Sequence, residues 1–567
     1  MSASAPAVAQ LSTQPFTAYG AGDAIALNAL SLGTSQVAGL RVAASGGSVN
    51  SGPAGLTTPI TNEYNQNVQP AKPDKNAYGR GTAIEAGVLT STPQTVDLNQ
   101  LILSGLAEAY APPPSALVTK DITIPAGALI YASTARGEAK ATYDPVYCPV
   151  GRPLSYGRGF VENLQLLGTQ NAGNGSIADP LLGTSISAGN PRATTQSRTV
   201  SYMISNGDGT FGLVSETRQT VAPISVANIG GVGGLLIEIA GEFGLRTIAT
   251  GKPGGASVAY TGNPLVTIST VVAGVAIPTL GPISLQDILG ANGLGTPPAL
   301  AALLSLSLGQ PPHALKGAPG APAAVAADGT SASGAADLLR LNVLNGTVDL
   351  GVAHMEGSVT VPAGGIKCTV PVSKTASVDP VTVGNDFSFT IKVPSDAALF
   401  STLFNCDLVN VSAVDTASVA SGTPKITLVS ADHGGVVSGN TVTWANLGGY
   451  TVGQDPITLT INARIPTNSG AGVLKDTVNV TASLGNCRGG TTGEDIIQGS
   501  NQITGIARLD GAAITGNVTL VGPSVTRGDL AATGGNSWPL VAGGGFLLAA
   551  LGLVRLRRRV TEVPAQG

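Results

Sequence analysis

Strict alternation of apolar and polar residues between positions 387 and 480 constrains the fold of this chain more than any other feature. Apolar residues recur there at every second position in short runs bounded by Gly, Asn or Ser: Phe387, Phe389, Ile391 and Val393, then Val442 and Trp444, then Ile457, Leu459 and Ile461, then Val478 and Val480. A period of two gives each strand one apolar face. Two sheets burying such faces over about 120 residues have immunoglobulin-like size. We therefore predict a β-sandwich over residues 366–490, with Trp444 in its core.

The preceding residues, 11–365, predict a β-rich body with short helices that could divide near residue 116. Short apolar stretches are broken by clusters of Gly, Ser and Asn, and residues 199–221 have the pattern of a hairpin turning at 206–209. Leucines at helical spacing predict a helix over 97–110, and 298–308 predicts a short buried helix. Residues 317–336, rich in Pro, Ala and Gly, predict a loop.

The overall composition favours exported β modules. The chain has 567 residues, enough for two to four domains, with 11% charged residues, 4% aromatics and 77 glycines. Its net charge is −4, so the chain lacks the excess of positive charge with which proteins bind nucleic acid. Residues 491–529 are polar and Gly-rich, which predicts a spacer with one further strand at 517–521. The fold class we predict is mainly β.

The C-terminus combines three elements in a fixed order. A pentapeptide is followed by an apolar run over residues 538–554 and then by cationic residues; the pentapeptide is Leu530, Ala531, Ala532, Thr533 and Gly534, and the cations are Arg555, Arg557, Arg558 and Arg559. Seventeen apolar residues span roughly 26 Å, slightly less than a bilayer core. Arginines beside a span are retained in the cytoplasm. We predict a transmembrane helix that holds the pentapeptide just outside the membrane; a plain tail anchor is the alternative.

This order resembles the cell-wall sorting signal of Gram-positive bacteria, at residues 530–559. With Ala531 at the second position, the pentapeptide is similar to the Leu-Ala-x-Thr-Gly variant associated with class E sortases of high-GC actinobacteria. The resemblance implies cleavage between Thr533 and Gly534 and transfer of the threonine to peptidoglycan. A wall protein must be exported, and the A-x-A pattern at 7–9 is typical of the end of a secretory signal, so we interpret residues 1–10 as the end of one whose precursor starts further upstream.

The predicted sandwich resembles the conserved-repeat (DUF11-type) immunoglobulin-like domain of bacterial surface proteins. The matching residues are Lys374-Thr375-Ala376, the run 381–391, Val411, Asp415-Thr416, the run 441–444, and Gly453, with Cys406 as a departure. The whole chain resembles actinobacterial surface proteins of the choice-of-anchor type, G subgroup, through the phrases at 208–219 and 327–331. These resemblances imply location rather than activity.

Four cysteines in an exported chain indicate disulfides. In a sandwich, Cys368 before the first strand and Cys406 at the start of the third should meet at one pole, which favours a Cys368–Cys406 bond. Cys148 and Cys487 would then be free or bridge two domains, although the turns before Cys487 could also bring it back to Cys406. No pair has C-x-x-C spacing, so we predict no metal site.

No motif predicts catalysis. The histidines, His313, His354 and His433, occupy unrelated contexts, and no G-x-S-x-G elbow supplies a nucleophile. We interpret them as surface or loop residues and predict neither catalytic residues nor a cofactor. The charged residues to examine for paired-carboxylate chemistry are Arg136, Glu138, Arg158, Glu162, Glu216 and Arg218. Charges on the wet face of a sheet explain them more simply.

Two functions are consistent with the sequence. The first is a non-enzymatic surface protein, secreted and joined to the cell wall by a class E sortase, with a structural or adhesive role and an unknown extracellular ligand. Its partners would be the sortase, peptidoglycan and, before processing, the membrane. The alternative is a wall-anchored glycan-binding protein or hydrolase with its site in residues 116–365. A concave polar site in the body would favour the alternative.

Overall fold

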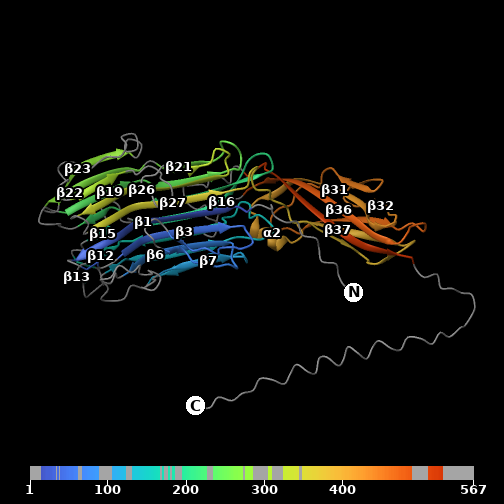
Figure 1. Cartoon of the computed structure of the whole chain (residues 1–567), viewed down its shortest axis with the longest axis horizontal. Coiled ribbons are helices and arrows are strands. Elements are labelled where there is room, and N and C mark those ends of the chain that lie inside the picture. Colours follow the sequence, from blue (N-terminus) through green and yellow to red (C-terminus); the bar gives the residue numbers. More distant parts are fainter. Residues whose placement is uncertain are drawn as a thin grey trace, which may run out of the picture.

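The computed structural model describes residues 15–32, 35–36, 39–61, 67–87, 105–122, 130–166, 169–170, 177–178, 182–184, 194–226, 234–262, 264–272, 275–284, 304–308, 324–343, 348–487 and 509–527. The chain is mainly β, as predicted from the sequence. It forms two parts arranged end to end (Figure 1): a head, made of the described residues up to 366, and a smaller sandwich, made of those after it.

Two large sheets packed face to face form the head. The first sheet contains, in spatial order, β24 (Leu304–Leu308), β26 (Ser331–Val343), β27 (Val348–Thr360), β1 (Thr17–Leu32), β3 (Gly39–Asn50), β6 (Ala77–Gly87) and β7 (Ala107–Ala111), with β2 (Ser35–Gln36) on β1 and β25 (Ala324–Val325) on β26. The second sheet contains β21 (Ser257–Thr261), β20 (Phe243–Ala249), β17 (Phe211–Thr220), β16 (Thr194–Ser205), β11 (Ser155–Glu162), β10 (Thr134–Ala141) and β8 (Val118–Asp121).

A third sheet extends the head at the end far from the sandwich (Figure 1). It contains β23 (Val275–Ser284), β22 (Leu265–Val272), β19 (Gly234–Ala240), β18 (Ile224–Val226), β15 (Leu182–Thr184), β12 (Gln165–Leu166) and β9 (Ile130–Tyr131). Two short ladders complete the described head: β4 (Ile60–Thr61) with β5 (Asn67–Gln69), and β13 (Thr169–Gln170) with β14 (Ile177–Ala178). The third sheet packs its apolar residues, Ile237 and Ile268 among them, into one core with the first sheet.

Glycines bring the first and second sheets unusually close. A Cβ on Gly157 of β11 would lie 1.7 Å from the carbonyl oxygen of Arg80 on β6, and a Cβ on Gly79 would lie 2.2 Å from that of Tyr156. Small hydroxyl residues fill the space beside them, as where Ser45 Oγ lies 2.7 Å from Ser197 Oγ. The high glycine content of the chain thus has a packing function, because side chains facing inward here would force the sheets apart.

The predicted hairpin is present as β16 and β17, which pair antiparallel around residues 206–210. Gly207 and Gly209 adopt positive φ angles of 85° and 82°, which glycine tolerates without strain. Asp208 Oδ1 accepts hydrogen bonds from the backbone N and the hydroxyl of Thr210, and Oδ2 lies 2.7 Å from Lys252 Nζ. Asp208 therefore stabilises a turn.

The sandwich has two sheets and one short helix. One sheet contains β28 (Ser373–Ala376), β30 (Asp386–Val393), β35 (Ile457–Arg464) and β32 (Thr427–Ala431). The other contains β29 (Val381–Thr382), β37 (Ala513–Thr526), β36 (Gly472–Gly485), β31 (Asp407–Gly422), β34 (Thr441–Trp444) and β33 (Val436–Ser438). Helix α2 (Ala397–Leu403) begins at Asp396, whose carboxylate caps Leu399 N at 2.9 Å. Trp444 lies in the core, as predicted.

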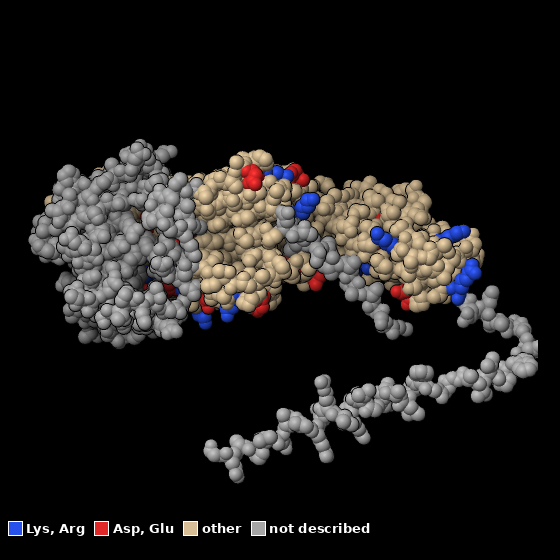
Figure 2. Space-filling model, viewed as in Figure 1, with Lys and Arg blue, Asp and Glu red and all other residues tan. Residues whose placement is uncertain are grey.

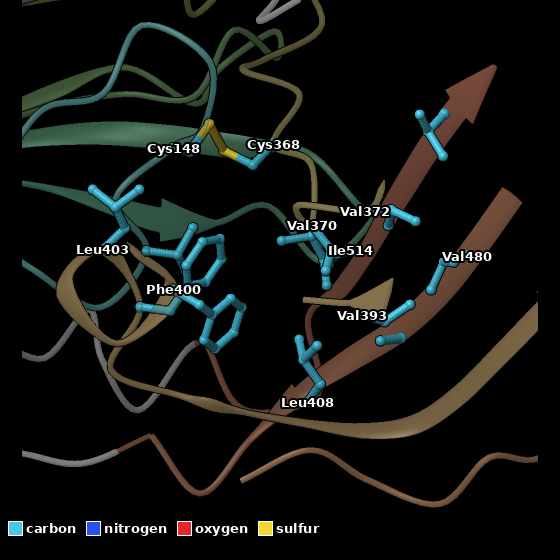
Figure 3. Close-up of a cluster of buried hydrophobic side chains, with 14 of the residues drawn as sticks. Cys148, Cys368, Val370, Val372, Val393, Phe400, Leu403, Leu408, Val480 and Ile514 are labelled. Atoms are coloured by element: carbon cyan, nitrogen blue, oxygen red, sulfur yellow. A yellow bond between two sulfur atoms is a disulfide. The ribbon is translucent and has the colours of Figure 1, made fainter. Parts of the chain in front are cut away.

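The head and the sandwich share a continuous hydrophobic cluster (Figure 3), in which the Cys148–Cys368 disulfide lies above Phe400 and Leu403 of α2. The connecting segment is hydrogen-bonded on both sides: Ile366 exchanges two backbone bonds with Phe211 of β17, and Val370 N donates to Thr515 O of β37. These bonds and the shared core indicate a stiff junction between the two parts.

The predicted Cys368–Cys406 disulfide is wrong. Cys148 is bonded to Cys368, with a Cα–Cα distance of 5.4 Å, and Cys406 is bonded to Cys487, at 4.0 Å. The prediction placed the end of the last strand at the opposite pole from Cys406. In the structure β36 runs antiparallel to β31, so that Asp407 faces Gly485 and the residues beside them meet. Cys368 lies at the junction instead, within reach of the head.

Several predicted elements also differ. Residues Ala107–Ala111 form strand β7 and Leu304–Leu308 form strand β24, where helices were predicted. Both segments alternate apolar with small or polar residues, and pairing with a neighbouring strand overrides their helical spacing. Strand β26 starts at Ser331, inside the predicted loop, and β37 belongs to the sandwich rather than to a spacer. Among the described residues, none forms a helix with the length and apolar character to cross a membrane; residues 538–554 lie outside them.

Candidate binding pocket and its buried ionic network

A pocket of about 370 Å³ opens on the head beside the first sheet. Strands β1, β3 and β27 form its floor, and the 55–60 segment and β5 form its rim. Its lining is mixed, with hydroxyl, amide and carboxylate groups among small apolar ones: Thr17, Ala18, Tyr19, Ser48, Val49, Asn50, Gly55, Leu56, Thr57, Thr58, Ile60, Gln69, Glu356 and Ser358.

The rim is held by a turn that the sequence specifies locally. Asn50 Oδ1 accepts from Gly52 N at 2.9 Å, and Asn50 Nδ2 donates to Gly55 O at 2.8 Å. Gly55 has a positive φ of 64°, and a Cβ there would lie 2.4 Å from the carbonyl oxygen of Lys75. Asn76 Nδ2 donates to Asn50 O and to Gly52 O, which joins the rim to the start of β6. The rim is therefore preformed.

Two polar atoms in the pocket lining lack hydrogen-bond partners within the described part of the chain. They are Ser48 Oγ and Gln69 Oε1, and both side chains are only 2% exposed. The amide of Gln69 is oriented by its nitrogen, which donates to Thr58 O at 2.9 Å. A buried polar atom without a partner is unfavourable by about 1–3 kcal/mol. Both atoms belong to residues of the pocket lining.

Glu356 is the carboxylate of the pocket, and two neighbours fix its orientation. Tyr19 OH donates to Oε2 at 2.9 Å, and His354 Nε2 lies 3.0 Å from Oε1. His354 Nδ1 lies 2.6 Å from Asp337 Oδ1. Tyr19 keeps its proton, since burial and then the charge of Glu356 raise the pKa of its hydroxyl well above the usual value. Glu356 therefore presents a fixed acceptor to the pocket.

The imidazole of His354 is fully buried between two carboxylates. Burial alone would lower the pKa of His354, but the charges and hydrogen bonds of Asp337 and Glu356 outweigh it, so the pKa is raised well above its usual value. The raised pKa favours the protonated ring, whose charge balances part of the acidic charge of Asp337 and Glu356.

A second buried group of charges adjoins the first on the same sheet. Arg41 Nε donates to Asp23 Oδ1 at 2.7 Å, and Arg41 Nη1 lies 2.9 Å from Glu85 Oε2. Arg80 Nη2 also pairs with Glu85. The charges of Arg41 and Asp23 both act on Tyr19, so the two groups are electrostatically one network. Removing one member would leave another charge buried without compensation, which is strongly destabilising.

The structure corrects the prediction that all three histidines are surface or loop residues. His354 is buried in β27, whereas His433 is 53% exposed in a turn beside Asp432. His313 lies outside the described residues. The signal that was missed is the period of two in β27, which places His354 and Glu356 on one face of a strand whose other residues are mostly apolar. The sorting residues 530–534 and 555–559 also lie outside the described residues.

The six charged residues chosen from the sequence lie on β10, β11 and β17 of the second sheet, away from the pocket. Arg136 Nε pairs with exposed Asp121 at 2.6 Å, and Arg158 Nη1 lies 3.5 Å from Glu138 Oε2. Glu216, which is buried, pairs with Arg218. Glu162 ends β11. The Arg136–Asp121 and Arg158–Glu138 pairs join neighbouring strands, whereas Glu216 and Arg218 lie two residues apart on β17. None of these residues lines the pocket. On the visible face of the described residues charges are few and of both signs (Figure 2).

Paired-carboxylate hydrolysis needs two carboxyl groups facing one ligand. Glu356 is the one carboxylate among the residues that line the pocket. The pocket can donate and accept hydrogen bonds and offers a few apolar contacts, which is the composition of a site for a small polar ligand.

Comparison with known proteins adds little to this geometry. No protein-family model and no curated protein matches the chain. Among solved structures, a DUF4466 family protein from Parabacteroides merdae is 15% identical, with a TM-score of 0.14, covering 28% of this chain and 46% of its own. A protein described as membrane anchored from Corynebacterium diphtheriae is 10% identical (TM-score 0.16; 62% and 95% covered). The N-terminal domain of the Streptococcus gordonii adhesin Sgo0707 is 9% identical (TM-score 0.15; 71% and 99% covered).

Proposed function

We propose that this chain is an exported surface adhesin, joined covalently to peptidoglycan by a sortase, whose head binds a small saccharide unit without transforming it. The observation that carries the binding role is the pair of buried, unpartnered acceptors, Ser48 Oγ and Gln69 Oε1, in the same pocket as the fixed carboxylate of Glu356.

Saccharides match this pocket chemically. Vicinal hydroxyl groups donate to carboxylate and amide oxygens and accept from serine hydroxyls, which are the groups that Glu356, Gln69 and Ser48 present. Leu56 and Ile60 offer apolar contact for the C–H face of a sugar ring. At about 370 Å³ the pocket lies at the small end of the usual range for ligand sites, about 300–1,000 Å³, and suits one or two sugar rings.

Wall attachment is supported by the order of pentapeptide, apolar run and arginines in residues 530–559. Strand β37 ends at Thr526, so the pentapeptide follows the last strand of the sandwich after three residues. Two disulfides join the four cysteines, and disulfides persist in exported proteins rather than in reducing cytosol.

Ligand binding can be tested by saturation-transfer NMR and calorimetry with a panel of neutral and amino monosaccharides and the muropeptide disaccharide. Replacing Gln69→Ala removes one acceptor and should weaken binding about 3- to 10-fold. The matched control is Ser201→Ala, which removes a buried, unpartnered hydroxyl outside the pocket lining and should leave affinity unchanged. Recovered ligand should be chemically intact. Absence of binding across the panel, or equal losses in both variants, would reject the saccharide assignment.

Anchoring can be tested separately in a Gram-positive host with a class E sortase. Thr533→Ala should move the protein from the muramidase-released wall fraction to the membrane fraction, whereas Thr526→Ala, at the exposed end of β37, should not. Mass spectrometry of the wall-released protein should find Thr533 as its C-terminus, joined to a peptidoglycan fragment. Wall-released protein that still carries residues 541–567 would contradict the sortase assignment.

A further inference from the structure

Three ionisable side chains meet in the core of the sandwich. Lys374 of β28, Asp415 of β31 and Asp476 of β36 are all fully buried. Lys374 Nζ pairs with Asp415 Oδ1 and lies 2.7 Å from Asp476 Oδ2. The ammonium also lies 4.7 Å from the centroid of the Phe389 ring. The three strands come from both sheets, so the contact crosses the middle of the sandwich.

The contact lacks the hydrogen bonds that a structural salt bridge needs at this depth. Asp415 Oδ2 and both carboxylate oxygens of Asp476 have no hydrogen-bond partner in the described chain. Although Asp476 Oδ2 is close to Nζ, it lies outside hydrogen-bond geometry, whereas Asp415 Oδ1 accepts from Nζ. Two buried carboxylates share one ammonium. Transfer of such charges from water is unfavourable by several kcal/mol per ion unless their hydrogen bonds are complete.

Burial favours the neutral form of Asp415, because desolvation penalises its charge. Desolvation raises the pKa of Asp415 to about 7; Lys374 opposes this rise and Asp476 adds to it. At neutral pH a proton is therefore available inside the cluster. Transfer of one further proton from Lys374 to Asp476 gives an uncharged amine beside an uncharged carboxylic acid, with no net change in charge.

From this juxtaposition we infer that Lys374 and Asp476 condense to form an intramolecular amide bond, with Asp415 as the proton carrier. The Lys374 amine attacks Cγ of the Asp476 carboxylic acid, and the new bond joins Nζ to Cγ. The C–OH bond of Asp476 breaks. Asp415 donates its proton to the departing hydroxyl and regains one from the attacking nitrogen. The products are a secondary amide, one water molecule and an unchanged Asp415, so the step needs no oxidant or co-reactant.

The geometry decides which aspartate is the acceptor. Asp415 Oδ1 accepts a hydrogen bond from the Lys374 amine, which is the position of a base that deprotonates it. Asp476 approaches the same nitrogen without a hydrogen bond, which leaves the nitrogen free to reach the carboxyl carbon. The surrounding core excludes water, which would otherwise hydrate both carboxylates and favour their charged forms.

The bond would connect the two sheets of the sandwich covalently. Strand β28 lies at one edge of the four-stranded sheet, and β36 lies within the six-stranded sheet between β37 and β31. The Cys406–Cys487 disulfide already joins the start of β31 to the end of β36 within one sheet. The amide would add the cross-sheet connection that the disulfide does not provide.

The test is the mass of the full chain after denaturation and complete reduction of both disulfides. The amide predicts a mass lower by one water molecule than the sequence requires. Trypsin does not cleave after an acylated lysine, so digestion should release one branched peptide joining residues 368–392 to residues 476–488. A full-length mass with all water retained would overturn the proposal. A branch joining 368–392 to 393–425 would identify Asp415 as acceptor and overturn the assignment to Asp476.

Variants separate the roles of the two aspartates. Asp476→Asn should still form the amide, now with loss of ammonia in place of water, and Asp476→Ala should not form it. Asp415→Ala should leave most of the chain unlinked. The matched control, Lys475→Met, removes an exposed lysine next to Asp476 and should keep the mass deficit, although the branched peptide then begins earlier. Persistence of the deficit in Asp476→Ala would refute the cross-link. Because the wild-type mass is decisive, misfolding of a variant does not affect the test.

Discussion

Gly157→Ala is the substitution whose effect the head architecture predicts most sharply. The first and second sheets approach closely at this position, where an added Cβ would lie 1.7 Å from the carbonyl oxygen of Arg80 and 2.5 Å from that of Gly46. Contacts of a real Cβ essentially never fall below 3.0 Å, so the two backbones would have to separate by about 1.3 Å. Both neighbours are backbone atoms inside sheets, which cannot rotate out of the way as a side chain can.

The separation would break hydrogen bonds that join residues across this interface. Ser45 Oγ lies 2.7 Å from Ser197 Oγ and 2.8 Å from Thr199 Oγ1, and a shift of about 1 Å moves each pair beyond bonding distance. Each buried polar group left without a partner is unfavourable by about 1–3 kcal/mol, and overpacking adds about 1–3 kcal/mol. We expect Gly157→Ala to lower the free energy of unfolding by about 3–6 kcal/mol, a large part of the usual total of 5–15 kcal/mol.

Differential scanning calorimetry of the full chain would measure the effect, since the head should melt roughly 6–12 °C earlier at about 2 °C per kcal/mol. Gly46→Ala is the matched control. It lies on β3, whose carbonyl oxygen at this residue faces Gly157, but its own Cβ would meet nothing closer than Val68 O at 3.7 Å, and it has no positive φ to strain. Replacing glycine without strain stabilises by about 0.4–1 kcal/mol through the unfolded state. Equal melting temperatures for the two variants would refute the close approach of the sheets.

Three further predictions follow from the described contacts. Peptide mapping without reduction should find Cys148 linked to Cys368, a pair 220 residues apart in the chain. Replacing both with Ser should lower the free energy of unfolding, measured by chemical denaturation, by about 2–5 kcal/mol. His354 has a raised pKa in the folded head, so its contribution to the free energy of unfolding is complete below about pH 6.5 and is lost as the pH rises through the folded pKa. The melting temperature of the head should therefore fall with rising pH more steeply in wild type than in His354→Gln. Parallel pH profiles of the two proteins would exclude this role of His354. A chain ended after residue 511 lacks β37 and should lose the cooperative melting of the sandwich, whereas one ended after residue 527 should retain it.

The sandwich was predictable because its signal is local. Alternation at 387–393 and 459–461 identifies side chains that the structure buries in the core, and the same holds for Trp444. Ile457, the first residue of the second run, is only partly buried. Its closure was not predictable, because β37 is separated from β36 by residues whose length and composition indicate a spacer. The disulfide pairing was predicted wrongly for a related reason. Pairing depends on which strand ends meet, and alternation says nothing about strand order.

The candidate pocket was not predictable from spacing. Its carboxylate, Glu356, is more than three hundred positions from Tyr19, which bonds it. The two meet because β1 and β27 are adjacent in the first sheet, a pairing between the start of the head and its end. The close sheet interface left a trace in the sequence, in the G-x-G patterns at 79–81 and 157–159, but a glycine pattern is equally typical of turns.

If the head binds a ligand and the C-terminal segment is attached to the wall, as proposed, the sandwich between them must withstand pulling forces. A pulling force across the sandwich would enter at residues 361–372, where the head joins the sandwich, and leave at Thr526. The disulfide at Cys368 fastens the first of these to the head. From there, load reaches β37 through the pairing at Thr515, through the short parallel pairing of β29 with β37, and through side-chain packing between the sheets. With an amide between β28 and β36, load would pass instead into the antiparallel ladder of β36 with β37, where many hydrogen bonds resist shear together. The buried lysine therefore lies where a covalent bond would connect the strand next to the head junction directly with that ladder.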